Sequence, residues 1–189
     1  MSFQCTREHK HSLLFDLLVT DSKVIKIGQF PSFADISVGD KSKYKTVLKD
    51  KLVEYNKALG LFAHGVGIGS LIYLRRIIEN LIFEKYCEIG ETLEINKEDF
   101  EALRFVEKIE TLKNHLPNLL YENRNLYGIV SKGVHELNEA ECVSMFPDIK
   151  IGIELILDEI LHEMETTEKA KGFSTFVANT TGELRAREG

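Results

Sequence analysis

Two charged side chains four residues apart, Arg75 and Glu79, lie within a very apolar segment and could do chemistry there. On a helical wheel of residues 70–86 they fall inside the apolar face and not on the narrow polar side. Side chains at this spacing meet on one face of a helix. Because a charge placed there is costly unless it is paired, we expect a buried ion pair whose loss would cost on the order of 3 kcal/mol.

This ion pair has two interpretations. It can be a structural pair that fixes the register of a central helix, or it can line a polar pocket. In such a pocket Glu79 would hold Arg75 toward a ligand phosphate or a catalytic partner. Because structural ion pairs also perturb local electrostatics, both interpretations stay open. Arg76, on the polar side of the same helix, and Arg124 are further candidates for binding such a ligand.

A second group of candidate catalytic residues, Ser131, Lys132 and His135, lies near the end of the helix predicted after Pro117. Ser131 and His135 are one helical turn apart, and a histidine has the intrinsic pKa of a general acid or base. No Gly-x-Ser-x-Gly elbow accompanies them. The alternative is that His135 caps or packs the helix end, where Gly133 permits close backbone approach.

A third candidate site is the N-terminal set Cys5, His9 and His11, whose side chains have the chemistry of zinc ligands. A structural zinc site needs four ligands, and the other cysteines, Cys87 and Cys142, belong to the helical part of the sequence. The alternative is a loose terminus with a fortuitous composition. No cofactor is predicted beyond this possible zinc ion.

The secondary structure that must position these residues is predicted to change along the chain from strands to helices. Two apolar runs around the polar turn Thr20–Lys23 predict a β-hairpin over residues 12–30, followed by a connector over 31–42. A two-stranded hairpin is marginal alone, so we expect it to pack on something larger.

From about Lys43 the spacing of apolar residues becomes helical. Asn96 is a predicted N-cap, and Asn138 with Glu141 has the form of a capping box. Pro147 is expected to split the last apolar stretch into a short helix and a longer one. The main helices are expected over about 70–86, 97–114, 117–135 and 148–169.

The predicted fold is mainly α: an antiparallel helical bundle over residues 43–170, with an N-terminal β-hairpin attachment and connector over 1–42. The polar residues 171–189 are expected to form a flexible tail.

The composition of the 189 residues limits the function. Net charge is −6, but residues 1–60 carry 10 Lys and Arg against 7 Asp and Glu (+3), whereas residues 61–189 carry 14 against 23 (−9). This charge disfavours broad, sequence-independent nucleic-acid binding and leaves room for a local basic pocket. Three cysteines, no secretory signal and no apolar run of about 20 residues predict a cytoplasmic protein that does not enter a membrane.

The segments SLIYLRRIIENLI, KIETL, HLPNLL and LYGIVSKGVHEL follow one another along the chain and are followed by a long apolar helix. Their order resembles the HEPN superfamily (higher eukaryotes and prokaryotes nucleotide-binding) and is closest to an uncharacterised bacterial branch. The resemblance covers about residues 60–165. It implies a HEPN-like helical bundle, homodimerisation through the helices that bear the site, and a role in toxin–antitoxin or phage-defence systems. Many members are metal-independent endoribonucleases.

The nuclease motif of the family, Arg-x(4–6)-His, is incomplete in this chain. Counting back from His135, the three allowed positions are Val130, Ile129 and Gly128, and none is arginine. Arg75 from the central helix can substitute only if the fold brings it to His135. RNA cleavage is therefore expected to be slow or absent.

The resemblance and the residues together predict a HEPN-like domain of a bacterial defence or stress system that cleaves RNA or binds RNA or a nucleotide. The alternative is a non-catalytic dimerisation or protein-interaction module. The expected partners are a second copy of the chain, RNA or a nucleotide, and a cognate antitoxin or defence protein.

Overall fold

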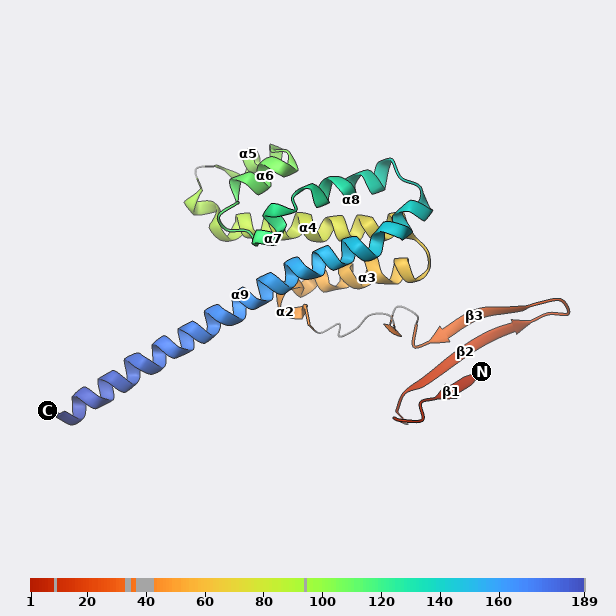
Figure 1. Ribbon diagram of the computed structural model, residues 1–189, viewed down its shortest axis with the longest axis horizontal. Helices are drawn as coiled ribbons and strands as arrows, with labels where there is room; N and C mark the ends of the chain where they lie inside the picture. Colours follow the sequence, from red (N-terminus) through yellow and green to blue (C-terminus); the bar gives the residue numbers. More distant parts are fainter. Residues whose placement is uncertain (9, 33–34, 37–42, 94, 189) are drawn as a thin grey trace.

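The computed structural model describes residues 1–8, 10–32, 35–36, 43–93 and 95–188 (Figure 1). For Val134, His135, Gly182 and residues 184–188 it describes the backbone alone. The fold is mainly α-helical with a small antiparallel sheet at the N-terminus, as the sequence predicts. None of the helices over the described residues combines the length and the hydrophobicity that a membrane span requires.

The sheet has the strand order β1-β2-β3, with β1 over Ser2–Gln4, β2 over Ser12–Val19 and β3 over Val24–Phe30. The predicted hairpin is confirmed: Thr20 and Lys23 close its turn with a backbone hydrogen bond of 3.0 Å. Strand β1 was not predicted, because its three residues are too few to show an alternating pattern. A register shift after Asp16 marks a bulge in the β2–β3 pairing.

This sheet is not packed on the helical body as predicted. The core cluster begins at Tyr44, and no described residue of the sheet belongs to it. Apolar side chains of the sheet and of the adjoining Met1 stay largely in solvent, with exposed fractions of 37–70%. The set comprises Met1, Phe3, Leu14, Leu17, Leu18, Val19, Val24, Ile25, Ile27 and Phe30.

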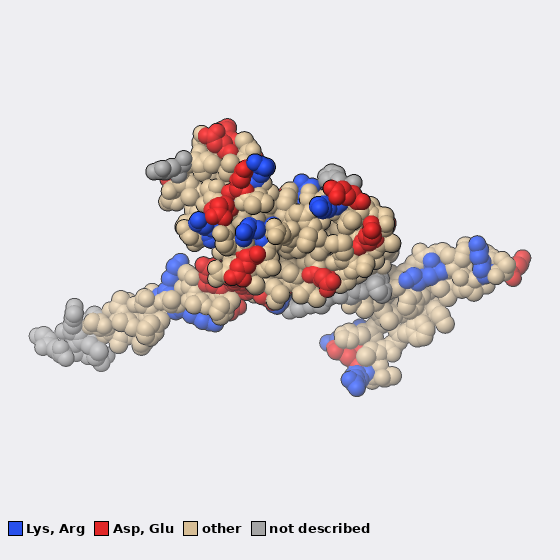
Figure 2. Space-filling view, turned by 45° about the horizontal axis from the view of Figure 1, so that its top comes forward, with Lys and Arg blue, Asp and Glu red and all other residues tan. Residues whose placement is uncertain are grey.

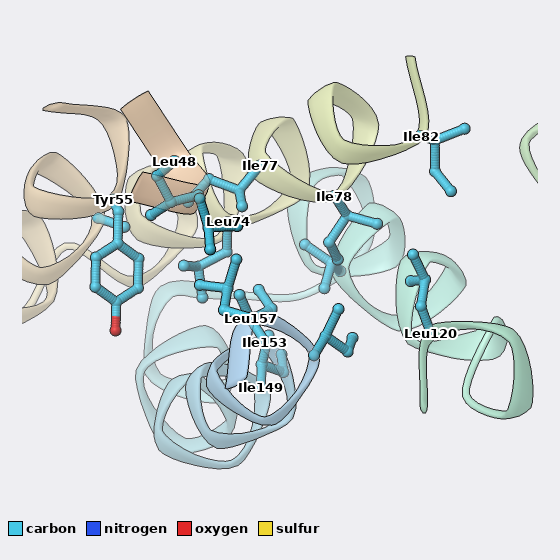
Figure 3. Packing of buried hydrophobic residues seen from close by; sticks show 14 of the residues in the cluster. Leu48, Tyr55, Leu74, Ile77, Ile78, Ile82, Leu120, Ile149, Ile153 and Leu157 are labelled. Carbon is cyan, nitrogen blue, oxygen red and sulfur yellow. The ribbon is translucent and has the colours of Figure 1, made fainter. Parts of the chain in front are cut away.

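The helical body is organised around one long helix, α4 (Gly67–Ile89), against which α3 (Leu52–Ala63), α8 (Asn125–His135) and α9 (Glu139–Glu188) pack. The inward faces of α4 and α9 meet through isoleucine and leucine side chains, with Tyr55 and Leu48 beside them (Figure 3). The remaining helical elements are α2 (Lys45–Leu48), η1 (Lys49–Lys51), η2 (Gly90–Thr92), α5 (Lys97–Ala102), α6 (Phe105–Thr111) and α7 (Asn118–Glu122).

Two predicted helix starts are confirmed in atomic detail. The Asn96 side chain accepts a hydrogen bond of 2.8 Å from the Asp99 N–H at the start of α5. Asn138 and Glu141 form the reciprocal capping box before α9, with hydrogen bonds of 2.8 and 3.1 Å. These caps follow from local sequence alone, because each bonds only within one turn.

Three predictions about helix continuity are wrong. The helix expected over 97–114 is divided into α5 and α6, because the Arg104 N–H bonds to the Glu107 carboxylate and starts a new helix. The helix expected over 117–135 is divided into α7 and α8 near Asn123. By contrast, α9 passes through Pro147 without a break. Pro147 is exposed, so water can bond the carbonyl that proline leaves unpaired.

α9 also continues as helix to Glu188, through the region that the sequence predicts to be a tail (Figure 1). Its last apolar side chains packed against the core cluster are Ile160 and Leu161. Beyond them Phe173, Phe176 and Val177 are exposed.

Two glycines allow the helices to approach closely, and the sequence predicts the close approach at Gly133. A Cβ atom on Gly67 would lie 2.5 Å from the Val143 backbone nitrogen, and one on Gly133 would lie 2.6 Å from a methyl carbon of Leu71. The Cys142 thiol donates a hydrogen bond of 3.2 Å to the Gly133 carbonyl. The starts of α4 and α9 and the end of α8 therefore meet at one point.

Candidate functional site

The expected ion pair forms on α4. Arg75 Nε donates to Glu79 Oε1 at 2.9 Å, but the two side chains are 28% and 37% exposed. The prediction that the pair is fully buried is therefore wrong. The packing of α3, α8 and α9 on α4 therefore covers these two side chains only in part.

Tyr127 of α8 completes the cluster. Its hydroxyl donates to the same Glu79 Oε1 at 2.7 Å, and the Arg75 guanidinium lies 5.2 Å from the centre of its ring. Phe105 of α6 stacks on Tyr127, with ring centres 3.5 Å apart and planes 13° from parallel. Arg75, Glu79 and Tyr127 form what we call the Arg75 cluster. It is a cation held against an aromatic ring, a geometry that favours the charged form.

The protonation states in the Arg75 cluster follow from these contacts. Burial opposes the charged guanidinium, but the hydrogen bond and the negative charge of Glu79 outweigh it and raise the pKa of Arg75. Burial raises the pKa of Tyr127, and the hydrogen bond that it donates to Glu79 raises it further. Tyr127 is therefore a hydrogen-bond donor and Arg75 a fixed cation at neutral pH.

Sequence reasoning missed Tyr127, although a signal was present. Arg124, Tyr127, Ser131 and His135 follow one another at spacings of three, four and four, so they share one side of α8. The tyrosine is the member of that line that faces Glu79. Nothing in the sequence pairs this line with α4, because that pairing depends on tertiary packing.

Two contacts fix how α8 runs along α4 (Figure 1). Tyr127 meets Glu79, and a side chain on Gly133 would meet Leu71, so the two helices are antiparallel. By interpolation Val130 lies about level with Arg75. His135 lies about 7 Å farther along the axis, at the helical rise per residue. Arg75 is thus level with Val130, which is one of the three positions on α8 at which the HEPN nuclease motif has its arginine.

The other candidate catalytic residues lie along the same helix. Ser131 is half-buried and Lys132 is exposed, and neither side chain has a hydrogen bond or ion pair within the described part of the chain. His135 is the last residue of α8. Its side chain lies outside the part that the structure describes, so its role stays a prediction.

The remaining candidate arginines do not join the Arg75 cluster. Arg76 pairs with Glu54 of α3 at 2.6 Å and is 53% exposed. Arg124, at the start of α8, donates to the Tyr121 carbonyl at 3.2 Å and lies 5.2 Å from the Tyr121 ring centre. Each is used in a local contact, and the structure does not bring them together with Arg75.

The N-terminal candidates for a metal site are brought together in part. The Cys5 N–H donates to the His11 carbonyl at 2.9 Å, and the Glu8 N–H donates to Cys5 Sγ at 3.4 Å. His9 lies outside the described residues. Among the residues that are described, no three His, Cys, Asp or Glu side chains gather as ligands of a metal ion.

Charge is mixed on the face of the helical body that Figure 2 shows. Acidic and basic side chains alternate on the face in Figure 2, and no broad basic patch is visible there. An extended nucleic acid bound without sequence preference would need such a patch. The Arg75 cluster offers instead one fixed cation on an aromatic platform, which suits a single phosphate group or a carboxylate.

Comparison of the chain with protein-family models, with curated proteins and with solved structures yields no significant match.

Proposed function

We propose that this chain is a HEPN-like helical domain of a bacterial defence or stress system and that it binds a phosphate group of RNA or a nucleotide beside Arg75. The observation that carries the proposal is the Arg75 cluster. Glu79 takes only the Nε–H of the guanidinium, and a guanidinium has four further N–H donors. The partial exposure of Arg75 leaves it accessible from solvent.

The position of Arg75 supports the link to the nuclease families. Arg75 is about level with Val130, so a cation from α4 occupies the level at which α8 lacks its arginine. Cleavage would also need a proton-transfer group, for which His135 is the candidate. Lys132 is a nearby cation that could help Arg75 stabilise charge at phosphorus. We propose binding as the main function and slow or absent cleavage.

The binding test is a comparison of two neutral substitutions. Arg75→Gln removes the clustered cation, and Arg104→Gln removes an exposed arginine on another helix, where it pairs locally with Glu107. Fluorescence anisotropy with a labelled single-stranded RNA and with a labelled nucleotide should show at least about tenfold weaker binding for Arg75→Gln only. A parent protein that binds neither probe overturns the proposal.

Cleavage is tested by incubating the purified protein with total RNA in EDTA. If the parent cleaves, His135→Ala should abolish cleavage and leave the circular dichroism spectrum unchanged. Robust cleavage by His135→Ala would show that the site has been assigned to the wrong residues.

A second candidate function is a non-catalytic interaction module. The observation that favours it is the exposed apolar surface of the sheet, which is larger than isolated surface residues would give. Such a module would bind a protein partner, a cognate antitoxin or a second copy, with equal affinity whether residue 75 is arginine or glutamine.

A further inference from the structure

A groove lies on the body at the point where α9 leaves it, away from the Arg75 cluster. It has a volume of about 690 Å³ and is walled by the second half of α4 and the middle of α9, with α2 and the segment before α7 at its ends. Its floor is apolar. The floor residues are Val47, Leu81, Leu116, Pro117, Leu120, Ile160, Leu161 and Met164. We call it the α4–α9 groove.

The dimensions of the α4–α9 groove suit a helix. Its α4 wall runs from Leu81 to Glu88 and its α9 wall from Ile160 to Lys171. At the helical rise these walls are about 10 Å and 16 Å long, or two to three turns of helix. A trough between two diverging helices, apolar along its floor and open to solvent, is how proteins receive the apolar face of a third helix.

The rim of the groove carries more negative than positive charge. Five glutamates and three lysines line it. Glu88 pairs with Lys85 at 2.7 Å, and Glu165 with Lys169 at 3.6 Å. The other three glutamates, Glu84, Glu163 and Glu168, form no ion pair within the described parts of the chain. The lysines of the rim that likewise form no ion pair there are Lys49 and Lys171.

We propose that the α4–α9 groove binds an amphipathic helix of a partner protein. The apolar face of that helix would cover Leu81, Leu161 and Met164, and lysine or arginine side chains along its flank would pair with the free carboxylates. Met164, which is 42% exposed, would be buried by the partner. Charge complementarity selects a basic helix over an acidic one and sets the register of binding.

The test uses the full chain and two labelled model peptides. Both have leucine at helical spacings i, i+3, i+4 and i+7, and their other positions are lysine in one and glutamate in the other. Anisotropy should show that the lysine peptide binds, more weakly at high salt, and that the glutamate peptide does not. Equal binding of both peptides, or binding of neither, overturns the proposal.

Three variants separate the groove from general attraction to an acidic protein. Glu163→Lys/Glu168→Lys reverses two free carboxylates of the rim, and Met164→Ser removes apolar contact from the floor. The matched control Glu91→Lys/Glu98→Lys reverses two exposed glutamates on η2 and α5, outside the groove. Each groove variant should weaken binding at least about tenfold, and the control less than about twofold. An equal loss in groove and control variants overturns the proposal.

Discussion

The carboxylate of Glu79 is shared by two donors, the guanidinium of Arg75 and the hydroxyl of Tyr127, and both bond the same oxygen atom. The stability that each contact contributes therefore depends on the other. Removing Glu79 leaves both donors without their acceptor. Removing the Tyr127 hydroxyl leaves Arg75 as the sole partner of that oxygen, with a weaker hold on its position.

We expect Glu79→Ala to lower the free energy of unfolding by about 1 kcal/mol, because water can reach both charges in this half-exposed pair. This is less than the 3 kcal/mol or so expected of a buried pair. Tyr127→Phe should have a similar cost, and in the double variant the two costs should not add. Urea unfolding of all four proteins measures the coupling. Strict additivity would mean that the hydrogen bond to Tyr127 does not form in solution.

The three cysteines should differ in reactivity. N–H groups of Glu8 and Arg7 lower the pKa of the Cys5 thiol, and burial raises the pKa of the Cys142 thiol. Between pH 7 and 8, Cys5 therefore has a larger thiolate fraction than Cys142. Cys5 should react first with a thiol reagent, and the buried Cys142 last. Cys5→Ser should remove the fast phase. A fast phase that survives this substitution contradicts the prediction.

At the scale of elements, close packing depends on glycines at helix ends. Gly67→Ala would place a methyl group 2.5 Å from backbone atoms of α9, so it should destabilise the protein by about 1–3 kcal/mol. Gly128 lies inside α8 with no neighbour within 4 Å of its would-be Cβ. Gly128→Ala should therefore stabilise by up to about 1 kcal/mol. Thermal unfolding compares the two, and a rise in the melting temperature of Gly67→Ala would contradict the packing described here.

The sequence predicts those features of the helices that depend on hydrogen bonds between residues close together in the chain. Asn96 and the Asn138–Glu141 box were identifiable because each cap bonds within three residues. The antiparallel contact of α8 with α4 was not identifiable, because Tyr127 and Glu79 are 48 residues apart. For the same reason the exposure of the Arg75–Glu79 pair could not be read from a helical wheel, which shows one helix and not its neighbours.

At the scale of the whole molecule, the exposed apolar surface predicts self-association. The sheet and the adjoining Met1 leave ten large apolar side chains in solvent, and α9 adds Phe173, Phe176 and Val177. We expect a homodimer that covers part of this surface. Light scattering at micromolar concentration should give twice the chain mass of 21.6 kDa. A mass equal to one chain would show that the surface is left for a different protein.

The length of α9 affects how the protein moves through water. Residues 162–188 carry the helix about 40 Å beyond its last contact with the core, at the helical rise per residue. A projecting rod adds friction without adding much mass, so the protein should diffuse slowly and elute from a sizing column ahead of compact proteins of equal mass. Sedimentation velocity should report a raised frictional ratio, and truncation after Glu163 should lower it.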